Sequence, residues 1–300
     1  MALEHIRRWK VGDVEISRIV EVYGFEDDVG FLLPGATPET LQKYDWLYPH
    51  FATPEGKMVI SFQAFVIQAG DRRIMLDTCI GNGRTRHFGV FNDMQTTFLE
   101  DIASVGCPAE SIDTVVCTHL HFDHTGWNTR WDGAAWVPTF PNARYLMVKE
   151  EYDDLLHSME HGEHYTGHVP DSVQPILDAG LVDFVDSNHR ITDEMWLFPT
   201  PGHTAGHCSL HISSKGGEAV LTGDLMHHPI QVAEPGWLGS FDGDKELAAK
   251  TRKAFLEKYG DGGALIIGGH FAEPTAGHVH RDGDSWRFAV QQPAKAKVEA

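Results

Sequence analysis

Four side chains that can bind a metal ion lie within six positions of the sequence, at His119, His121, Asp123 and His124. They follow residues 112–117, a short run rich in Val and Ile that predicts a buried strand. Alternate residues of an extended chain share a face, so His119 and His121 can contact one ion while Asp123 and His124 face a second. Packing alone explains this spacing poorly, because a core would have to satisfy every ring nitrogen. Imidazole and carboxylate ligands favour zinc and related divalent ions.

Three further predicted strand ends carry a candidate ligand. They are His203 after residues 195–199, Asp224 after residues 218–222, and His270 after residues 264–267. His207 begins the next apolar strand and is interpreted as structural, whereas His203 follows a turn. Asp224 is placed to bridge two ions, with a turn cap as the alternative role. Ligands gathered at strand ends predict an α/β sandwich with the site along one edge, and residues 1–300 are expected to form a single domain.

Hairpin and helix patterns supply the remaining elements. The predicted elements are a hairpin of residues 59–68 and 73–76, and helices at residues 92–105, 149–159, 171–179 and 244–259. Asp77 begins the glycine-rich loop that follows the hairpin, and we expect it to orient a ligand histidine from behind.

Two other segments attract attention through their composition. Residues 31–58 contain several prolines, which exclude one long helix, and several aromatic side chains. This aromatic loop region either packs as a satellite core or lines a pocket near the site. His157, His161, His164 and His168 are interpreted as solvated loop or lid residues, with contact to a substrate as the alternative. Residues 291–300 are expected to form a loose polar tail.

Charge and cysteine content restrict the partners and the compartment. The chain has 24 basic and 43 acidic residues, a net charge of −19, which disfavours nucleic acid and anionic membranes as partners. No apolar run reaches the length of a membrane span. The first residues lack the apolar stretch of a secretory signal, so a cytoplasmic location is expected, although a segment removed earlier would leave no trace. Four cysteines without C-x-x-C spacing indicate free thiols in a reducing compartment.

The pattern H-x-H-x-D-H, together with the later candidates, resembles the signature of the metallo-β-lactamase superfamily. The resemblance covers nearly the whole chain and implies a four-layer αββα sandwich. It also implies the full dinuclear ligand set, with His119, His121 and His203 on one ion, Asp123, His124 and His270 on the other, and Asp224 bridging them. The commonest true β-lactamases have Arg and Cys where this chain has His124 and Asp224.

The carboxy-terminal third resembles methyl parathion hydrolase and the N-acyl homoserine lactone lactonases. The residues that carry this likeness are Gly223 to Met226, Gln231, Thr251 to Phe255, His270 and Gly277 to Val279. Those lactonases have a tyrosine three positions after the bridging aspartate. This chain has His227 there, so His227, or its neighbour His228, is the candidate donor to a substrate oxygen.

The expected function is dinuclear hydrolysis of a lactone or ester bond, as in quorum quenching, with phosphotriesterase activity as a further expectation. Two divalent ions roughly 3.5–4 Å apart can share a hydroxide that attacks the substrate, and Asp123 or Asp224 could carry a proton to the leaving group. Zinc is the expected metal, and iron, manganese and cobalt accept the same ligands. Phe122, Trp46 and Trp237 are predicted to contact a small, neutral, partly hydrophobic substrate.

Two other functions fit the same residues. One is a mononuclear iron dioxygenase acting on a thiol or persulfide, and the other is a non-catalytic metal-binding module. Metal content and oxygen uptake distinguish the first from a hydrolase, and a broad ester panel distinguishes the second. A homodimer is compatible with the sequence.

Overall fold

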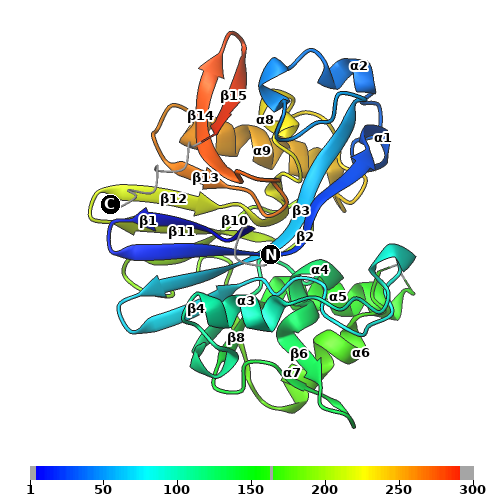
Figure 1. The fold of residues 1–300 in the computed structure, drawn as a ribbon, viewed down its shortest axis with the longest axis vertical. Helices are drawn as coiled ribbons and strands as arrows, with labels where there is room; N and C mark the ends of the chain where they lie inside the picture. Colours follow the sequence, from blue (N-terminus) through cyan, green and yellow to red (C-terminus); the bar gives the residue numbers. More distant parts are fainter. Residues whose placement is uncertain (1–4, 163–164, 291–300) are drawn as a thin grey trace, which may run out of the picture.

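The computed structural model describes residues 5–162 and 165–290, and its centre consists of two β-sheets packed face to face. Figure 1 shows helices α3 to α7 below the sheets and helices α8 and α9 above them. The predicted four-layer αββα sandwich is therefore confirmed. Within the described ranges, no helix combines the length and the apolar character needed to cross a bilayer. The predicted polar tail, residues 291–300, lies outside the described residues.

The seven-stranded sheet has the order β1-β2-β3-β4-β5-β8-β9, and the six-stranded sheet runs from β10 to β15 in chain order. The strands of the first sheet are β1 (Arg7–Val11), β2 (Val14–Asp28), β3 (Lys57–Ala69), β4 (Arg72–Leu76), β5 (Thr114–Val116), β8 (Arg144–Val148) and β9 (Val182–Val185). Those of the second sheet are β10 (Met195–Pro199), β11 (Cys208–Ser214), β12 (Gly217–Leu221), β13 (Leu265–Ile267), β14 (Ala276–Asp282) and β15 (Ser285–Val290). A separate ribbon pairs β6 (Thr129–Trp131) with β7 (Trp136–Pro138).

Most of the helices are short. They are α1 (Val29–Leu32), α2 (Pro38–Leu41), α3 (Phe98–Ser104), α4 (Phe122–Thr125), α5 (Lys149–Glu160), α6 (Val169–Ser172), α7 (Gln174–Asp178), α8 (Ile230–Ala233) and α9 (Lys245–Tyr259). Single 3-10 turns occur at Asp45–Leu47, Gly89–Phe91, Ala109–Ser111, Gly126–Asn128 and Gly223–Leu225.

Apolar side chains from both sheets fill the space between them. Ile16, Phe65 and Leu76 from the first sheet join Leu210 and Ile267 from the second in one buried cluster. Alternate residues of a strand point to opposite faces, so the other face of each sheet is free to receive helices. Helix α3 covers the first sheet and helix α9 covers the second, each through its own buried cluster. Full burial of one such side chain contributes roughly 1.5–3 kcal/mol.

The helix predicted at residues 92–105 is shorter than expected, since α3 begins only at Phe98. The backbone N–H and the hydroxyl of Thr96 bond to Asn82 Oδ1, at 2.8 and 3.0 Å. These contacts hold the preceding residues against the loop after β4. A tertiary hydrogen bond therefore overrides the apolar spacing that predicted a longer helix.

The helix predicted at residues 171–179 is divided into α6 and α7. Pro175 lies in the first turn of α7, where a proline can begin a helix but cannot continue one. Asp171, at the predicted start of this helix, accepts hydrogen bonds from Arg84, at 2.7 Å, and from Arg86, at 2.9 Å. The carboxylate therefore anchors the loop that contains both arginines.

The aromatic loop region, residues 31–58, is mostly core. Leu41, Leu47 and Phe51 are completely buried in the cluster that includes helix α9. Phe31, at the beginning of the region, is 47% exposed and lines the large cavity described below. Of the two predicted roles, satellite core thus describes most of the region and pocket lining describes its first residues.

Candidate metal centre

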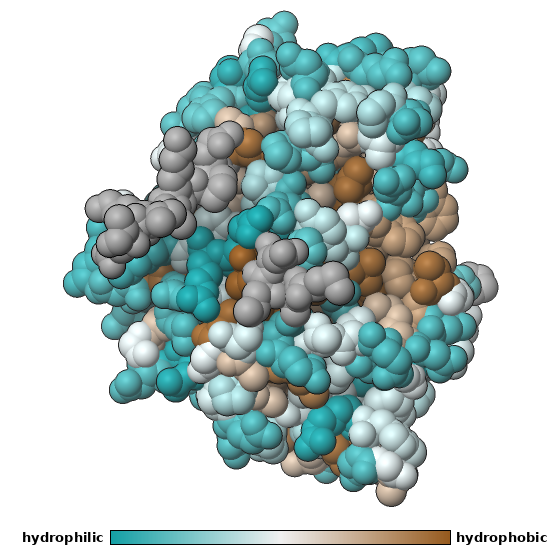
Figure 2. Space-filling view, viewed as in Figure 1, coloured by the Kyte–Doolittle hydropathy of each residue, from teal (hydrophilic) through white to brown (hydrophobic). Residues whose placement is uncertain are grey.

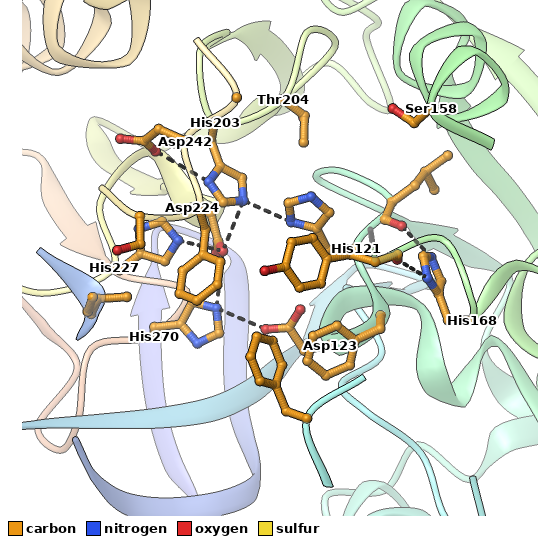
Figure 3. A pocket seen from close by; sticks show the side chains of 18 of the residues that line it. His121, Asp123, Ser158, His168, His203, Thr204, Asp224, His227, Asp242 and His270 are labelled. Atoms are coloured by element: carbon orange, nitrogen blue, oxygen red, sulfur yellow. Dashed lines mark hydrogen bonds and ion pairs between the residues drawn. The ribbon is translucent and has the colours of Figure 1, made fainter. Parts of the chain in front are cut away.

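All seven sequence-predicted ligands meet at one edge of the sandwich. His119 and His121 follow β5, Asp123 and His124 lie in α4, His203 follows β10, Asp224 lies in the turn after β12, and His270 follows β13. β5 runs parallel to β4 and β8, and β12 runs parallel to β13. Parallel strands end at the same edge of a sheet, and that edge is where polar residues after each strand converge. Figure 3 shows five of the seven side chains facing one another across the base of a pocket.

The first group of donors comprises three histidines and one carboxylate oxygen. His119 Nε2 and His203 Nε2 each lie 3.0 Å from His121 Nδ1. Asp224 Oδ2 lies 3.5 Å from His203 Nε2 and 3.9 Å from His119 Nε2. Four ligands placed tetrahedrally about 2.1 Å from a zinc ion lie about 3.4 Å from one another. The spacing of this group fits such an ion.

The second group lies beside the first and shares Asp224 with it. His270 Nε2 is 3.3 Å from His124 Nε2 and 3.4 Å from Asp123 Oδ2. Asp224 Oδ1 is 3.3 Å from His124 Nε2, while Asp224 Oδ2 lies between the groups, 3.2 Å from His270 Nε2 and 3.5 Å from His203 Nε2. One carboxylate therefore contacts nitrogen atoms of both groups.

The outer nitrogen atoms of His124 and His270 determine the protonation of the inner nitrogen atoms, which face the proposed ions. His124 Nδ1 lies 2.9 Å from Asp77 Oδ2, and His270 Nδ1 lies 3.0 Å from the carbonyl oxygen of Ser61. Each outer nitrogen faces an oxygen acceptor, so in the neutral ring it carries the proton and the inner nitrogen presents a lone pair. Asp77 does hydrogen-bond to a histidine of the motif, as expected.

Inner ring nitrogens and carboxylate oxygens thus converge on one space. Asp224 Oδ1 is buried and has no hydrogen-bond partner. A buried acceptor without a donor is costly, and a cation between these atoms would satisfy it together with the inner ring nitrogens. The donor set therefore fits two divalent cations.

Burial determines the protonation of the first group. It lowers the pKa of His121 to about 4 and the pKa values of His119 and His203 well below the ordinary value, so these rings are neutral. Neutral imidazole is the form that binds a metal. Burial also acts to lower the pKa values of His124 and His270, but the nearby carboxylates outweigh it and raise both.

Asp242 and Arg252 support His203 and were missed by the sequence reasoning. Asp242 Oδ1 lies 3.4 Å from His203 Nδ1, and its Oδ2 accepts a hydrogen bond from Arg252 at 3.0 Å. Burial acts to raise the pKa of Asp242, but the hydrogen bond from His203 and the charge of Arg252 hold it below its usual range. The arginine is completely buried on the inner face of α9. A charged residue on an apolar helix face is the sequence signal that could have indicated a buried partner.

His207 is structural, as interpreted. Its Nδ1 lies 3.0 Å from the carbonyl oxygen of Thr200, and its Nε2 accepts a hydrogen bond from the backbone N–H of Asp224 at 2.9 Å. The ring therefore holds the turn that presents Asp224.

The solvated role predicted for His157, His161, His164 and His168 is wrong for one of them. His168 is only 3% exposed, and its Nε2 lies 2.7 Å from the carbonyl oxygen of Leu120. Burial lowers its pKa to about 4. His157 and His161 are exposed, and His157 lines the cavity. His164 lies outside the described residues.

A cavity of about 790 Å³ opens above the two donor groups. One wall is aromatic and includes Phe62, Phe88, Phe122 and Phe241. Three exposed side chains, Phe31, Val90 and Tyr165, belong to the same lining. Figure 2 shows hydrophobic surface at the right of the molecule, at a height between those of helices α1 and α5 in Figure 1. The lining also includes carboxylates such as Asp154, and no lysine or arginine lines the cavity within the described part of the chain.

Only one of the three predicted substrate contacts belongs to the cavity lining. Phe122 lines the cavity, whereas Trp46 and Trp237 do not. Trp46 packs edge-on against Tyr44 beside the buried core, and the backbone oxygen of Trp237 accepts a hydrogen bond from Arg252. Neither tryptophan belongs to the cavity lining, because loop packing that the sequence does not reveal places both against the core.

Comparison with known proteins places this geometry in context. The model of the metallo-beta-lactamase superfamily matches residues 63–270. An N-acyl homoserine lactonase from Bacillus sp is 25% identical over 241 residues, covering 75% of this chain and 87% of that protein. The solved structure of AidC, described as a dizinc quorum-quenching lactonase with a bound product, matches with a TM-score of 0.78 at 21% identity, over 96% of this chain and 97% of AidC. The hydrolase AbOPH matches with a TM-score of 0.79 at 23% identity, over 96% of this chain and 98% of its own.

Proposed function

The chain belongs to the metallo-beta-lactamase superfamily, and from that premise we propose that it is a dinuclear metal-dependent hydrolase of lactone or ester bonds. One observation carries the proposal: the Asp224 carboxylate lies within 3.5 Å of ring nitrogens from two separate sets of donors, at the base of a largely apolar cavity. A mononuclear dioxygenase would leave one of those sets without a role. The lactonases among the relatives support a lactone as the substrate class.

Divalent cations, with zinc as the preferred species, would lower the pKa of a water between them and polarise the substrate carbonyl. His119, His121 and His203 would hold one cation, and Asp123, His124 and His270 the other, with Asp224 between them. Both Asp123 and Asp224 line the cavity, and the Asp123 side chain is 11% exposed against 4% for Asp224. Asp123 is therefore the carboxylate better placed to carry a proton to the leaving oxygen.

The cavity itself indicates the substrate. Its aromatic wall suits an apolar acyl group, and the carboxylates in its lining would repel an anion. We therefore assign a small, neutral, partly hydrophobic ester or lactone, with a neutral phosphotriester as an accompanying substrate.

Protein loaded with zinc is expected to hold two ions per chain and to open acyl homoserine lactones and hydrolyse aryl esters. A chelator should stop turnover, and added zinc should restore it. The kcat/KM for neutral substrates should be about tenfold higher than for matched anionic substrates, because the carboxylates of the cavity repel a negative charge. Elemental analysis and proton release at constant pH measure these results, with phosphotriesters included in the panel. Full activity of metal-free protein, or one iron with oxygen uptake, would contradict the proposal.

His227 is proposed as the donor to the substrate oxygen. Its ring lines the cavity between His203 and His270, with Nε2 3.3 Å from Asp224 Oδ2. Its Nδ1 is buried without a hydrogen-bond partner, so the ring has capacity for a further contact. His228, the other candidate, bonds instead to the carbonyl oxygen of Phe51 at 2.7 Å, away from the cavity lining.

We expect His227→Phe to lower kcat on the order of 10²-fold while both ions remain bound, because the ring shape is kept and one donor is lost. Steady-state kinetics and metal content on the same sample test this. Loss of one ion in His227→Phe would identify the residue as a metal ligand instead, and unchanged kcat would remove it from the mechanism.

A further inference from the structure

The histidines of the first donor group come from two different sheets. His119 and His121 follow β5 of the seven-stranded sheet, whereas His203 follows β10 of the six-stranded sheet. The position of His203 relative to the other two therefore depends on contacts that cross between the sheets. One such contact is the backbone hydrogen bond from Cys208 N–H to the carbonyl oxygen of Thr118, at 3.0 Å.

The carboxylate of Glu151 makes the second contact between these loops. Its Oε1 accepts a hydrogen bond from the backbone N–H of Leu120 at 2.9 Å, and its Oε2 accepts one from Gly206 at 3.1 Å. Leu120 lies between His119 and His121, and Gly206 lies in the loop that follows His203. One side chain thus links both ligand-bearing loops, each through a separate oxygen.

The surroundings of Glu151 are built for this contact. The residue is 4% exposed and lies in the first turn of α5, where the helix dipole stabilises a carboxylate. A Cβ atom at Gly206 would lie 2.2 Å from the backbone nitrogen of Glu151, so only glycine permits the approach. Burial raises the pKa of Glu151 to about 7, although both N–H donors act in the opposite direction.

We propose that Glu151 is a positioning residue that holds His203 in place relative to His119 and His121. It thereby sets the affinity of this first donor group for its cation. The proposal rests on the dinuclear site of the proposed function. Loss of a group that orients metal ligands typically costs 10–100-fold in metal affinity. Glutamine has one acceptor oxygen in place of two, so Glu151→Gln must leave one of the two N–H groups without its partner.

The test compares Glu151→Gln with Glu21→Gln in zinc competition against a chromogenic chelator. Glu21 is a matched control because its carboxylate also accepts backbone N–H groups, from Ile80 at 2.6 Å and Gly81 at 3.2 Å, in a loop without ligand histidines. Glu151→Gln should lower the affinity for one of the two zinc ions 10–100-fold. Glu21→Gln should leave that affinity unchanged. The loss should persist in a His270→Ala background, which removes a donor of the second group only.

Activity then separates positioning from direct contact with the substrate. Saturating zinc should restore kcat of Glu151→Gln to within about threefold of the wild type, because the ligands themselves are intact. Wild-type affinity for both ions in Glu151→Gln would overturn the proposal, and so would a kcat that stays low at saturating zinc. Metal affinity is read without any substrate, so failure of the chain to hydrolyse lactones would not affect this result.

Amide hydrogen exchange in the wild-type holoprotein provides a measurement that needs no variant. If Glu151→Gln does not fold, the amides of Leu120 and Gly206 decide the question, because a single carboxylate holds both. They should be protected to the same degree, within about tenfold. Protection of Leu120 with free exchange at Gly206 would show that the two loops are not joined.

Discussion

Asp224→Asn is expected to lower kcat/KM on the order of 10³-fold or more and to release zinc from both positions. Asp224 is the only proposed ligand whose oxygens face both donor groups, at 3.5 Å from His203 Nε2 and 3.3 Å from His124 Nε2. Asparagine keeps the shape but carries no charge and directs an amide N–H₂ at one of the two sets. Kinetics and elemental analysis of the same preparation measure the effect.

Asp183→Asn is the control, since it makes the same chemical change in a carboxylate that is 46% exposed and is paired with Arg144. It should retain both ions and full activity. The fold of Asp224→Asn should be kept, as shown by an unchanged circular dichroism spectrum. Two tightly bound ions and wild-type kinetics in Asp224→Asn would remove the bridging role from the mechanism.

Asp171→Ala is expected to lower the free energy of unfolding by about 3 kcal/mol. The Arg84 and Arg86 side chains are 0% and 1% exposed, and both bond to this carboxylate. Removing the carboxylate leaves two buried guanidinium groups without a negative charge beside them. Asp171 itself is 17% exposed, so the loss of unfolding free energy is expected at the lower end of the usual range for a broken buried ion pair. Urea unfolding at a fixed zinc concentration measures the difference.

Asp183→Ala again serves as the control, because an exposed ion pair contributes less than about 1 kcal/mol. Similar losses in the two variants would show that the buried arginines are stabilised by other contacts. The loop that contains Arg84 and Arg86 continues into Phe88 of the cavity wall, so Asp171→Ala should also raise KM for apolar substrates.

Much of the proposed site could be predicted because its signals are local. The motif at residues 119–124 combines donor types and a two-residue period that belong to an extended segment entering a turn. His203, Asp224 and His270 could be singled out because each follows an apolar run and a glycine or a turn. His203 could also be distinguished from His207, since only His207 begins an apolar strand.

The supporting residues could not be predicted in the same way. Glu151 and Asp242 act on loops that lie 31 to 55 residues away in the sequence, and nothing in the local pattern marks such contacts. The same reason explains Trp46 and Trp237, whose aromatic character suggested substrate contact although loop packing directs them elsewhere. It also explains His168, which occurs in a polar stretch but is buried against Leu120.

By itself, the sequence determined which side chains can donate to a cation and that strand ends present them, because ligand chemistry and strand periodicity are properties of a few neighbouring residues. The tertiary structure alone decided which buried carboxylates hold these donors and which aromatic residues face the cavity. Those relations are distances between parts of the chain that only the packing of two sheets brings together.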